Sequence, residues 1–159
     1  MKRTVCVILA ALLGGLALCW LAVKGWNSYY YQTNGILRGY TAKEEHFEKD
    51  AIQDSTDYCK YFYASAEPFE KDGRYRRITE ADAAEIKGYF ADFAEWMETG
   101  DRLEEYDFDD SIIGAGDYVF LHTKEGQPIG TMTYGKYDNY SVCFFDVESC
   151  VLYFIHSNI

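Results

Sequence analysis

The chain has few basic residues for its number of acidic ones. It holds 15 Lys and Arg against 26 Asp and Glu, and its formal net charge is −11 at pH 7. Lys2 and Arg3 are the only basic residues before Lys24, so the chain from Lys24 onward contains 13 basic residues and all 26 acidic ones. A surface of this charge repels phosphate backbones and anionic lipid headgroups. The composition therefore excludes nucleic acid as a partner and leaves cationic peptides, metal ions and neutral sugars open.

The chain also lacks the cysteine spacing of a metal site or a disulfide framework. Two of its five cysteines, Cys6 and Cys19, lie in an apolar N-terminal segment, and Cys59, Cys143 and Cys150 lie beyond it. No C-x-x-C occurs and no histidine stands at ligand spacing, so these residues do not predict zinc. We interpret the last three as small buried hydrophobic residues. A Cys143–Cys150 bridge across a hairpin stays open for an oxidising compartment.

Motifs for catalysis or cofactor binding are absent from the sequence. The G-A-G run at 114–116 lacks the third glycine of a dinucleotide fingerprint, and no G-x-S-x-G occurs. The acidic run 101–110 has the composition of a calcium loop. An EF-hand starting at Asp107 would need Gly and Glu where Ile112 and Tyr118 stand. We therefore expect no cofactor, no metal site and no catalytic residue set.

The chain has only three histidines: His46, His122 and His156. A nucleophilic site needs a Ser or Cys beside a base, with an acid that orients the base. No local sequence signature predicts such a group here. We interpret His122 and His156 as structural, and keep a small hydrolase-like extracytoplasmic enzyme, with scattered His, Asp and Glu residues, as an alternative function.

One long apolar run is present, Thr4 to Val23, without a single charged residue. A helix of this length spans about 30 Å, the thickness of a bilayer hydrocarbon core. A signal peptide has a shorter apolar core and a small-residue cleavage site, whereas this run ends in Trp20-Leu21-Ala22-Val23. We expect a single-pass anchor that contacts the lipid bilayer through Thr4 to Val23. A secreted protein with a cleaved signal peptide is the alternative.

The residues that flank this run predict its orientation. Lys2 and Arg3 precede it, so the positive-inside rule places the N-terminus in the cytoplasm and the rest of the chain outside the cell membrane. Five aromatic residues at its far end are typical of a membrane–water interface: Trp20, Trp26, Tyr29, Tyr30 and Tyr31. We expect an anchor over residues 1–26, a connector over 27–40 and an extracytoplasmic domain over 41–159.

The domain begins with two helix signals. The capping pattern at 41–44 and apolar residues at helical spacing predict an amphipathic helix from Ala42 to Tyr63. A second capping pattern starts at Thr79, and an apolar stripe behind it predicts a helix from Glu80 to Thr99. Gly100 is suited to the left-handed residue that ends many helices.

Strand formers dominate the rest of the chain. The runs are Tyr118–Thr123, Ile129–Tyr134, Tyr140–Phe145 and Val151–His156. Sequential strands joined by short turns predict an antiparallel β-meander of about four strands, with the two helices packed on it. The fold class is α+β, helices first and sheet last. By analogy of element order alone, cystatin-like and NTF2-like folds share this order.

Tyrosine is unusually frequent, with 15 residues. Tyr134, Tyr137, Tyr140 and Tyr153 lie in or beside the predicted sheet, and tyrosine is enriched at binding surfaces. These four either line a groove for a peptide or glycan or fill the edges of the core. Together with the anchor, they favour a non-enzymatic binding or interaction module of the cell envelope, whose partner is an envelope protein, a peptide or a glycan.

Overall fold

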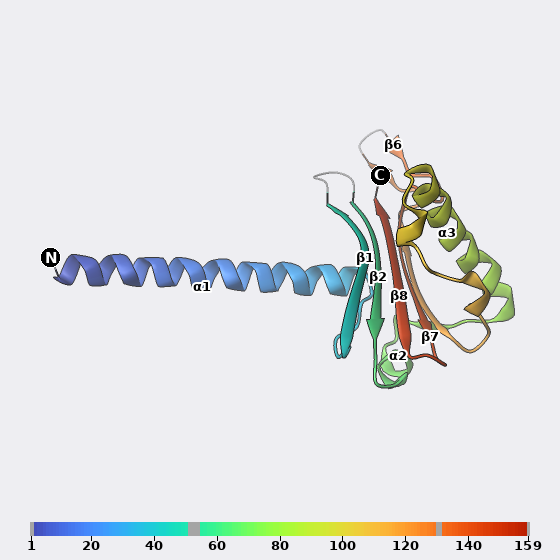
Figure 1. The fold of residues 1–159 in the computed structure, drawn as a ribbon, viewed down its shortest axis with the longest axis horizontal. Helices are drawn as coiled ribbons and strands as arrows, with labels where there is room; N and C mark the ends of the chain where they lie inside the picture. The colour runs from blue at the N-terminus through green and yellow to red at the C-terminus, as the bar shows by residue number, and fades with distance from the viewer. Residues whose placement is uncertain (1, 51–54, 130–131, 159) are drawn as a thin grey trace. The chain divides into compact units, whose positions relative to one another are not determined.

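The structure is a computed structural model that describes residues 2–50, 55–129 and 132–158, with side chains for 13–47, 55–128 and 133–158. The chain forms two compact units, residues 1–33 and 34–159. The second unit holds all the strands and the remaining helices (Figure 1).

The first unit is a single helix, α1 (Lys2–Thr33). It contains the predicted apolar segment, Thr4 to Val23, and continues through the first part of the predicted connector. The side chains of residues 4–12 lie outside the described residues. From Leu13, which is 66% exposed, to Val23, at 58%, the large apolar side chains are exposed. Within the part of the chain that the structure describes, no helix has both the length and the hydropathy needed to cross a membrane.

The second unit is built on a six-stranded sheet with the order β1-β2-β8-β7-β4-β3, in which every neighbouring pair is antiparallel. The strands are β1 (Ala42–Asp50), β2 (Ser55–Phe62), β3 (Arg76–Arg77), β4 (Tyr118–Thr123), β7 (Asn139–Asp146) and β8 (Val151–Asn158). Two short strands, β5 (Pro128–Ile129) and β6 (Met132–Thr133), form a separate hairpin between β4 and β7. The α+β class with an antiparallel sheet is confirmed.

One face of the sheet is covered by α3 (Glu80–Thr99), the predicted second helix with the predicted bounds (Figure 1). Thr79 and Asp82 form the capping box at its start, and their hydrogen bonds lower the pKa of Asp82 to about 2. The stripe Ile86, Phe90, Phe93 and Met97 is buried against the sheet. Burial of this stripe explains why the helical period in the sequence predicted α3 correctly.

The end of α3 differs from the expectation at one residue. Gly100 has φ −81°, and the left-handed residue is Asp101, at φ 58°. The amides of Asp101 and Arg102 bond the carbonyls of Glu98 and Met97, so a Schellman motif ends the helix with an aspartate in the position where glycine was predicted. Two short 3₁₀ turns, η1 (Leu103–Glu105) and η2 (Asp110–Ile112), follow.

The predicted helix from Ala42 to Tyr63 is wrong: this stretch forms β1 and β2. Residues 56–59 are buried in succession, because β2 lies inside the sheet and both of its faces are covered. A surface helix could bury only one stripe of this segment, whereas an inner strand buries both sets of side chains. The expected cap residue Thr41 instead bonds the Phe62 carbonyl through its amide and its hydroxyl.

The order of elements is also corrected. The sheet does not follow two helices, because β1 and β2 precede α3, and β8 pairs with β2 as well as with β7. The predicted strand 129–134 is replaced by β5 and β6, and residues 130–131 lie outside the described residues. None of the four described cysteines, Cys19, Cys59, Cys143 and Cys150, forms a disulfide.

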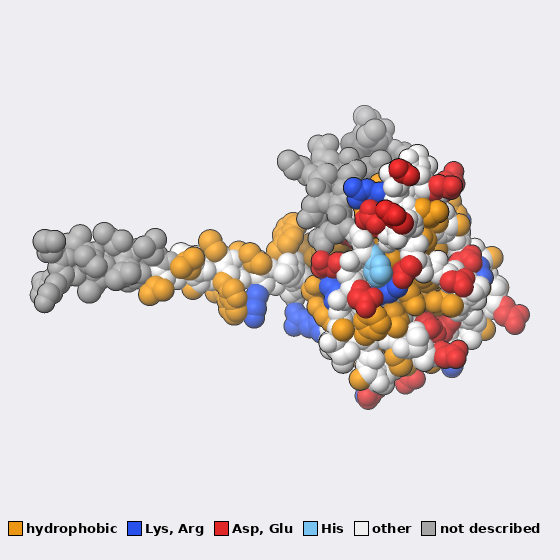
Figure 2. Space-filling view, viewed as in Figure 1, with side chains coloured by type: hydrophobic (Ala, Val, Ile, Leu, Met, Phe, Trp, Pro, Cys, Tyr) orange, Lys and Arg blue, Asp and Glu red, His pale blue; other side chains and the backbone are white. Residues whose placement is uncertain are grey.

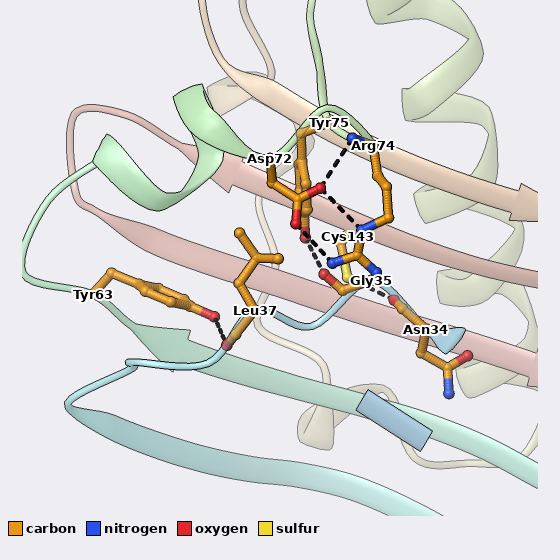
Figure 3. A network of polar contacts seen from close by, with 8 residues as sticks. All are labelled: Asn34, Gly35, Leu37, Tyr63, Asp72, Arg74, Tyr75 and Cys143. Atoms are coloured by element: carbon orange, nitrogen blue, oxygen red, sulfur yellow. Dashed lines mark hydrogen bonds and ion pairs between the residues drawn. The ribbon is translucent and has the colours of Figure 1, made fainter. Parts of the chain in front are cut away.

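The second face of the sheet is covered by a short irregular segment, Asn34–Leu37, which begins with a turn and which we call the strap. All four of its residues are buried. The Tyr75 hydroxyl donates to the Gly35 carbonyl and the Tyr63 hydroxyl to the Leu37 carbonyl, each at 2.7 Å (Figure 3). The Cys143 thiol donates to the Asn34 carbonyl at 3.1 Å. The strap is therefore fixed to the sheet through its own main chain.

A small aromatic cluster completes this second face. Phe69, on α2 (Glu67–Lys71), stacks on Phe145 of β7 with ring centres 3.7 Å apart and meets Tyr63 and Tyr75 edge to face. Arg74, from the basic run 74–77, pairs with Asp72 beside the cluster (Figure 3). Arg76 of the same run pairs with Asp82 of α3.

Candidate functional site

A groove of about 310 Å³ lies between the C-terminal half of α3 and the chain that leads into β7. Its lining residues are Asp92, Phe93, Glu95, Trp96, Thr99, Tyr137, Asp138, Tyr140 and Ser157. The volume is at the lower end of the range for ligand pockets and suits a side chain or a small molecule. This groove is our candidate functional site.

The helix side of the groove follows from residue spacing. Asp92, Trp96 and Thr99 are separated by four and three positions and so share one flank of α3, beside the buried stripe that contains Phe93. Trp96 also packs against Phe47 of β1 and Phe93, with ring centres at 5.5 and 6.0 Å. These contacts hold the indole ring in place at the groove.

The opposite wall depends on a glycine in α3. A Cβ atom at Gly88 would lie 2.9 Å from the Tyr137 hydroxyl, so the glycine lets this ring approach the helix closely. Tyr137 also meets Tyr89 edge to face at 5.1 Å. The missing side chain at Gly88 thus creates the space that Tyr137 fills.

A hydrogen bond joins the two walls. Tyr140 lies on β7 and is 1% exposed, and its hydroxyl donates to Oδ2 of Asp92 at 3.2 Å. Burial raises the pKa of Asp92, the Tyr140 hydrogen bond lowers it, and the charges of Glu95 and Asp138 raise it further, with a net shift upward. Burial and the nearby carboxylate raise the pKa of Tyr140 as well. A positive charge placed beside Asp92 would therefore stabilise the ionised form of this carboxylate.

The charge of the groove has one sign. Asp92, Glu95 and Asp138 contribute carboxylates, and among the described lining residues none is basic. Lys136 stands beside the Tyr137 wall, with its ammonium group 5.3 Å from the Tyr137 ring centre and 5.7 Å from that of Tyr89. A concave site lined by one sign of charge concentrates ions of the opposite sign, and aromatic faces attract ammonium and guanidinium groups. The arrangement suits a cation.

The four predicted tyrosines are divided by the structure. Tyr137 and Tyr140 line the groove. Tyr134 lies at the base of the β5–β6 hairpin, where the Lys124 ammonium is 5.6 Å from its ring centre. Tyr153 lies on β8 and packs against Phe108 and Phe144. Only two of the four therefore share this site.

Sequence reasoning missed the helix residues of the site. Asp92 and Trp96 lie at the edge of the apolar stripe of α3. Polar and aromatic residues are common at this position of an amphipathic helix, so the two residues did not stand out in the sequence. Their four-residue spacing was visible, but nothing in the sequence showed that Tyr137 and Tyr140 face them from more than 40 residues away. The hydrogen bond between Tyr140 and Asp92 exists only in the folded domain.

His156 belongs to a separate polar cluster on the second face. Its Nδ1 lies 3.0 Å from the Tyr140 carbonyl and 2.9 Å from the Ser141 hydroxyl, and its Nε2 lies 3.1 Å from the Ser55 hydroxyl. A carbonyl can only accept, so Nδ1 carries the hydrogen and Nε2 accepts from Ser55. Burial lowers the pKa of His156 to about 4. This neutral imidazole links β2, β7 and β8.

The other two histidines lie elsewhere. His122 is exposed on β4. His46, on β1, lies 3.9 Å from Asp107, which also accepts hydrogen bonds from Tyr58 and Lys60. Burial raises the pKa of Asp107, but these hydrogen bonds lower it more. These hydrogen bonds attach the acidic run 101–110 to β2. Within the described residues, no set of three or more His, Cys, Asp or Glu side chains could hold a metal ion.

The predicted interface residues Trp20, Trp26, Tyr29, Tyr30 and Tyr31 lie on α1. Trp20, Trp26 and Tyr29 are 58–70% exposed, and the Lys24 ammonium lies 4.1 Å from the Trp20 ring centre. On the domain, Figure 2 shows Asp and Glu side chains spread over the visible face with hydrophobic side chains between them.

Comparisons with protein-family models, with curated proteins and with solved structures find no significant match to this chain.

Proposed function

We propose that this chain is a membrane-anchored, non-enzymatic binding module that holds a cationic side chain of a protein partner in the groove beside α3. The observation that carries the proposal is the convergence of Asp92, Glu95 and Asp138 on a groove walled by Trp96 and Tyr137. A neutral glycan could stack on the rings, but three carboxylates with no basic lining residue among those described favour a positive charge.

The burial of Asp92 supports the same proposal. Its raised pKa means that the folded domain holds an ionised carboxylate in a place that disfavours the charge. A bound ammonium or guanidinium group would offset this cost, and the excess of 26 acidic over 12 basic residues in the second unit, 34–159, attracts such groups from a distance.

The binding experiment is calorimetry on the full-length chain in detergent micelles. The probes are a short acetylated, amidated peptide with one central lysine and the same peptide with acetyl-lysine. We expect only the charged peptide to bind. Asp92→Asn should weaken binding about tenfold, the loss expected for one charge-assisted contact. Glu67→Gln on α2, which removes the same charge far from the groove, should change it less than twofold. Equal binding of both peptides would refute the proposal.

The anchor is the second part of the proposal. The apolar, charge-free run Thr4 to Val23 and the exposed apolar side chains of α1 from Leu13 to Val23 support insertion in a bilayer, with the N-terminus cytoplasmic and the domain outside the cell membrane. The test is alkaline extraction of membranes, intact-mass analysis and protease access to a C-terminal tag. We expect a full-length protein that resists extraction and loses its tag on intact cells or spheroplasts. A shortened protein in the medium would refute the anchor in favour of a cleaved signal peptide.

A further inference from the structure

A second groove, of about 380 Å³, lies along the other flank of α3. Ala91 and Ala94 of this groove lie on the opposite flank of α3 from Asp92 and Trp96, because successive residues of a helix are rotated by about 100° about its axis. The facing wall comes from the chain after η1, with Tyr106 and Phe108, and the rim holds Asp109 and Asp110. The helix therefore runs between two grooves, each bordered by carboxylates.

The wall of the second groove is well fixed. Phe108 stacks on Phe90 with ring centres 4.0 Å apart, and the Tyr106 hydroxyl donates to the Phe90 carbonyl at 3.1 Å. The small side chains of Ala91 and Ala94 leave the opposite side open. The result is a preformed open groove whose aromatic and alanine walls would accept the methylene chain of a long side chain.

The rim of the second groove is anionic. Asp109 accepts a hydrogen bond from the Ser111 amide at 2.9 Å, and the Ser111 hydrogen bonds lower the pKa of Asp109. Lys87 of α3 contributes a smaller effect in the same direction, so one lysine of the chain itself already stands near this rim. A groove with aromatic and alanine walls and a carboxylate rim is complementary to lysine or arginine, whose stem is apolar and whose end is charged.

The two grooves lie at overlapping levels of α3, around residues 90–94 and 92–99. A helix with its side chains is about 10–12 Å across. In an extended peptide, residues four apart lie on the same side and are separated by about 13 Å. Ala91 and Glu95 are exposed on the outer face between the grooves, so a peptide backbone that crosses there would pass over one small side chain and one carboxylate, which favours a cationic segment.

We propose that the partner is an extended, cationic peptide segment that crosses α3 and places one basic side chain in each groove, with the two basic residues four positions apart. This inference rests on the proposed function, because the first groove supplies one of the two contacts. The second contact becomes intramolecular once the first is made, so a correctly spaced pair should gain affinity well beyond a statistical factor of two.

The test is calorimetry on the full-length chain in detergent micelles with three Gly/Ser-based peptides. One carries a single lysine, one carries two lysines four positions apart, and one carries two lysines at adjacent positions. We expect the spaced pair to bind at least about tenfold more tightly than the single lysine and clearly more tightly than the adjacent pair. Asp109→Asn with Asp110→Asn should abolish this gain and leave single-lysine binding within twofold.

Two further variants serve as controls. The pair Glu67→Gln and Glu70→Gln removes the same charge from α2 and should leave the spacing effect intact. Lys87→Gln should strengthen binding of the spaced pair by removing a competing cation. If single-lysine binding holds but the adjacent pair equals the spaced pair, the two-groove inference is overturned and the proposed function stands. If no charged peptide binds, both are overturned. If spermidine binds as tightly as the spaced peptide, a small polycation replaces the peptide as the ligand.

Discussion

The two faces of the sheet use tyrosine in opposite ways. On the face that α3 covers, the hydroxyls of Tyr58 and Tyr140 reach outward to the carboxylates of Asp107 and Asp92 at the edges of the core. On the second face, the hydroxyls of Tyr63 and Tyr75 reach main-chain carbonyls of the buried strap. A carboxylate acceptor changes its charge with pH and a main-chain carbonyl does not, so we expect only the first pair of hydrogen bonds to depend on pH.

The difference has a structural cause. A 20-residue helix covers its face with a continuous apolar stripe, so its flanks remain available for polar residues and grooves. A four-residue strap has little apolar area, and hydrogen bonds from the sheet must hold it. Stability on the α3 face should therefore depend on packing, and stability on the second face on hydrogen bonds and backbone conformation.

The largest expected effect is on the α3 face. Phe93 is 1% exposed and packs between α3 and the sheet, so Phe93→Ala should lower the free energy of unfolding by about 3–5 kcal/mol. Urea unfolding followed by far-UV circular dichroism measures this. Glu98→Ala, on the exposed side of the same helix, should change it by less than about 0.5 kcal/mol. A Phe93→Ala loss below 1 kcal/mol would show that packing does not dominate this face.

The next effect concerns the backbone of the strap. Gly35 has φ +81°, and a Cβ atom there would lie 2.2 Å from Cδ1 of Phe120. Gly35→Ala should therefore cost about 2–4 kcal/mol, from the left-handed conformation and from the clash together. Gly39 is the matched control, because it has φ +98° and nothing near its Cβ position.

Gly39→Ala should cost only the conformational part, about 1–2 kcal/mol. The same urea unfolding measures both variants. Equal losses for the two alanine variants would mean that Phe120 yields easily and that the strap is not tightly seated.

Removal of one strap hydrogen bond should have a smaller effect. Tyr75→Phe keeps the ring that contacts Phe69 and deletes the bond to the Gly35 carbonyl, at a cost of about 1 kcal/mol. Because a carbonyl does not titrate, the cost should be the same at about pH 5 and at about pH 8. Hydrogen exchange should show faster exchange of the strap amides than of β8 amides. A cost that changes with pH would contradict the contrast between the two faces.

The smallest effect is a gain. Asp92 has a raised pKa in the folded domain, so folding takes up a proton between the ordinary pKa of aspartate and the raised one, and stability falls as pH increases through that window. Asn retains the acceptor for Tyr140 and has no charge. Asp92→Asn should therefore stabilise the domain above the window, by no more than about 1 kcal/mol because solvent screens this half-exposed group.

Unfolding of both proteins at several pH values checks the sign. Asp117, whose pKa burial also raises, should leave part of the pH dependence in the variant. Binding of a cationic peptide should weaken as the pH falls through the raised pKa of Asp92, since protonation removes the charge that attracts the ligand. If Asp92→Asn is more stable than the parent protein and binds the cationic peptide equally well, then Asp92 does not contribute to binding.

Local patterns predicted those parts of the fold in which one periodicity dominates. The capping box at Thr79 and the stripe behind it defined α3, and dense β-branched and aromatic runs defined β4, β7 and β8. Residues 42–63 misled the same reasoning, because the many Lys and Glu residues of the edge strand β1 resemble an exposed helix face. For the site, Tyr137 and Tyr140 were predicted, whereas the flank of α3 that faces them depends on tertiary packing.

The thiol of Cys143 gives the strap a chemical reporter. It is fully buried beneath the Asn34 carbonyl, and burial raises its pKa to about 12. An alkylating reagent reacts with a thiolate, so Cys143 should be modified only during the fraction of time that the strap is lifted. The ratio of its reaction rate in the folded protein to its rate in the unfolded chain, resolved by peptide mass spectrometry, then gives the equilibrium constant for that opening, and the less buried Cys150 serves as an internal control. A local fluctuation of four residues becomes measurable as a rate of covalent labelling.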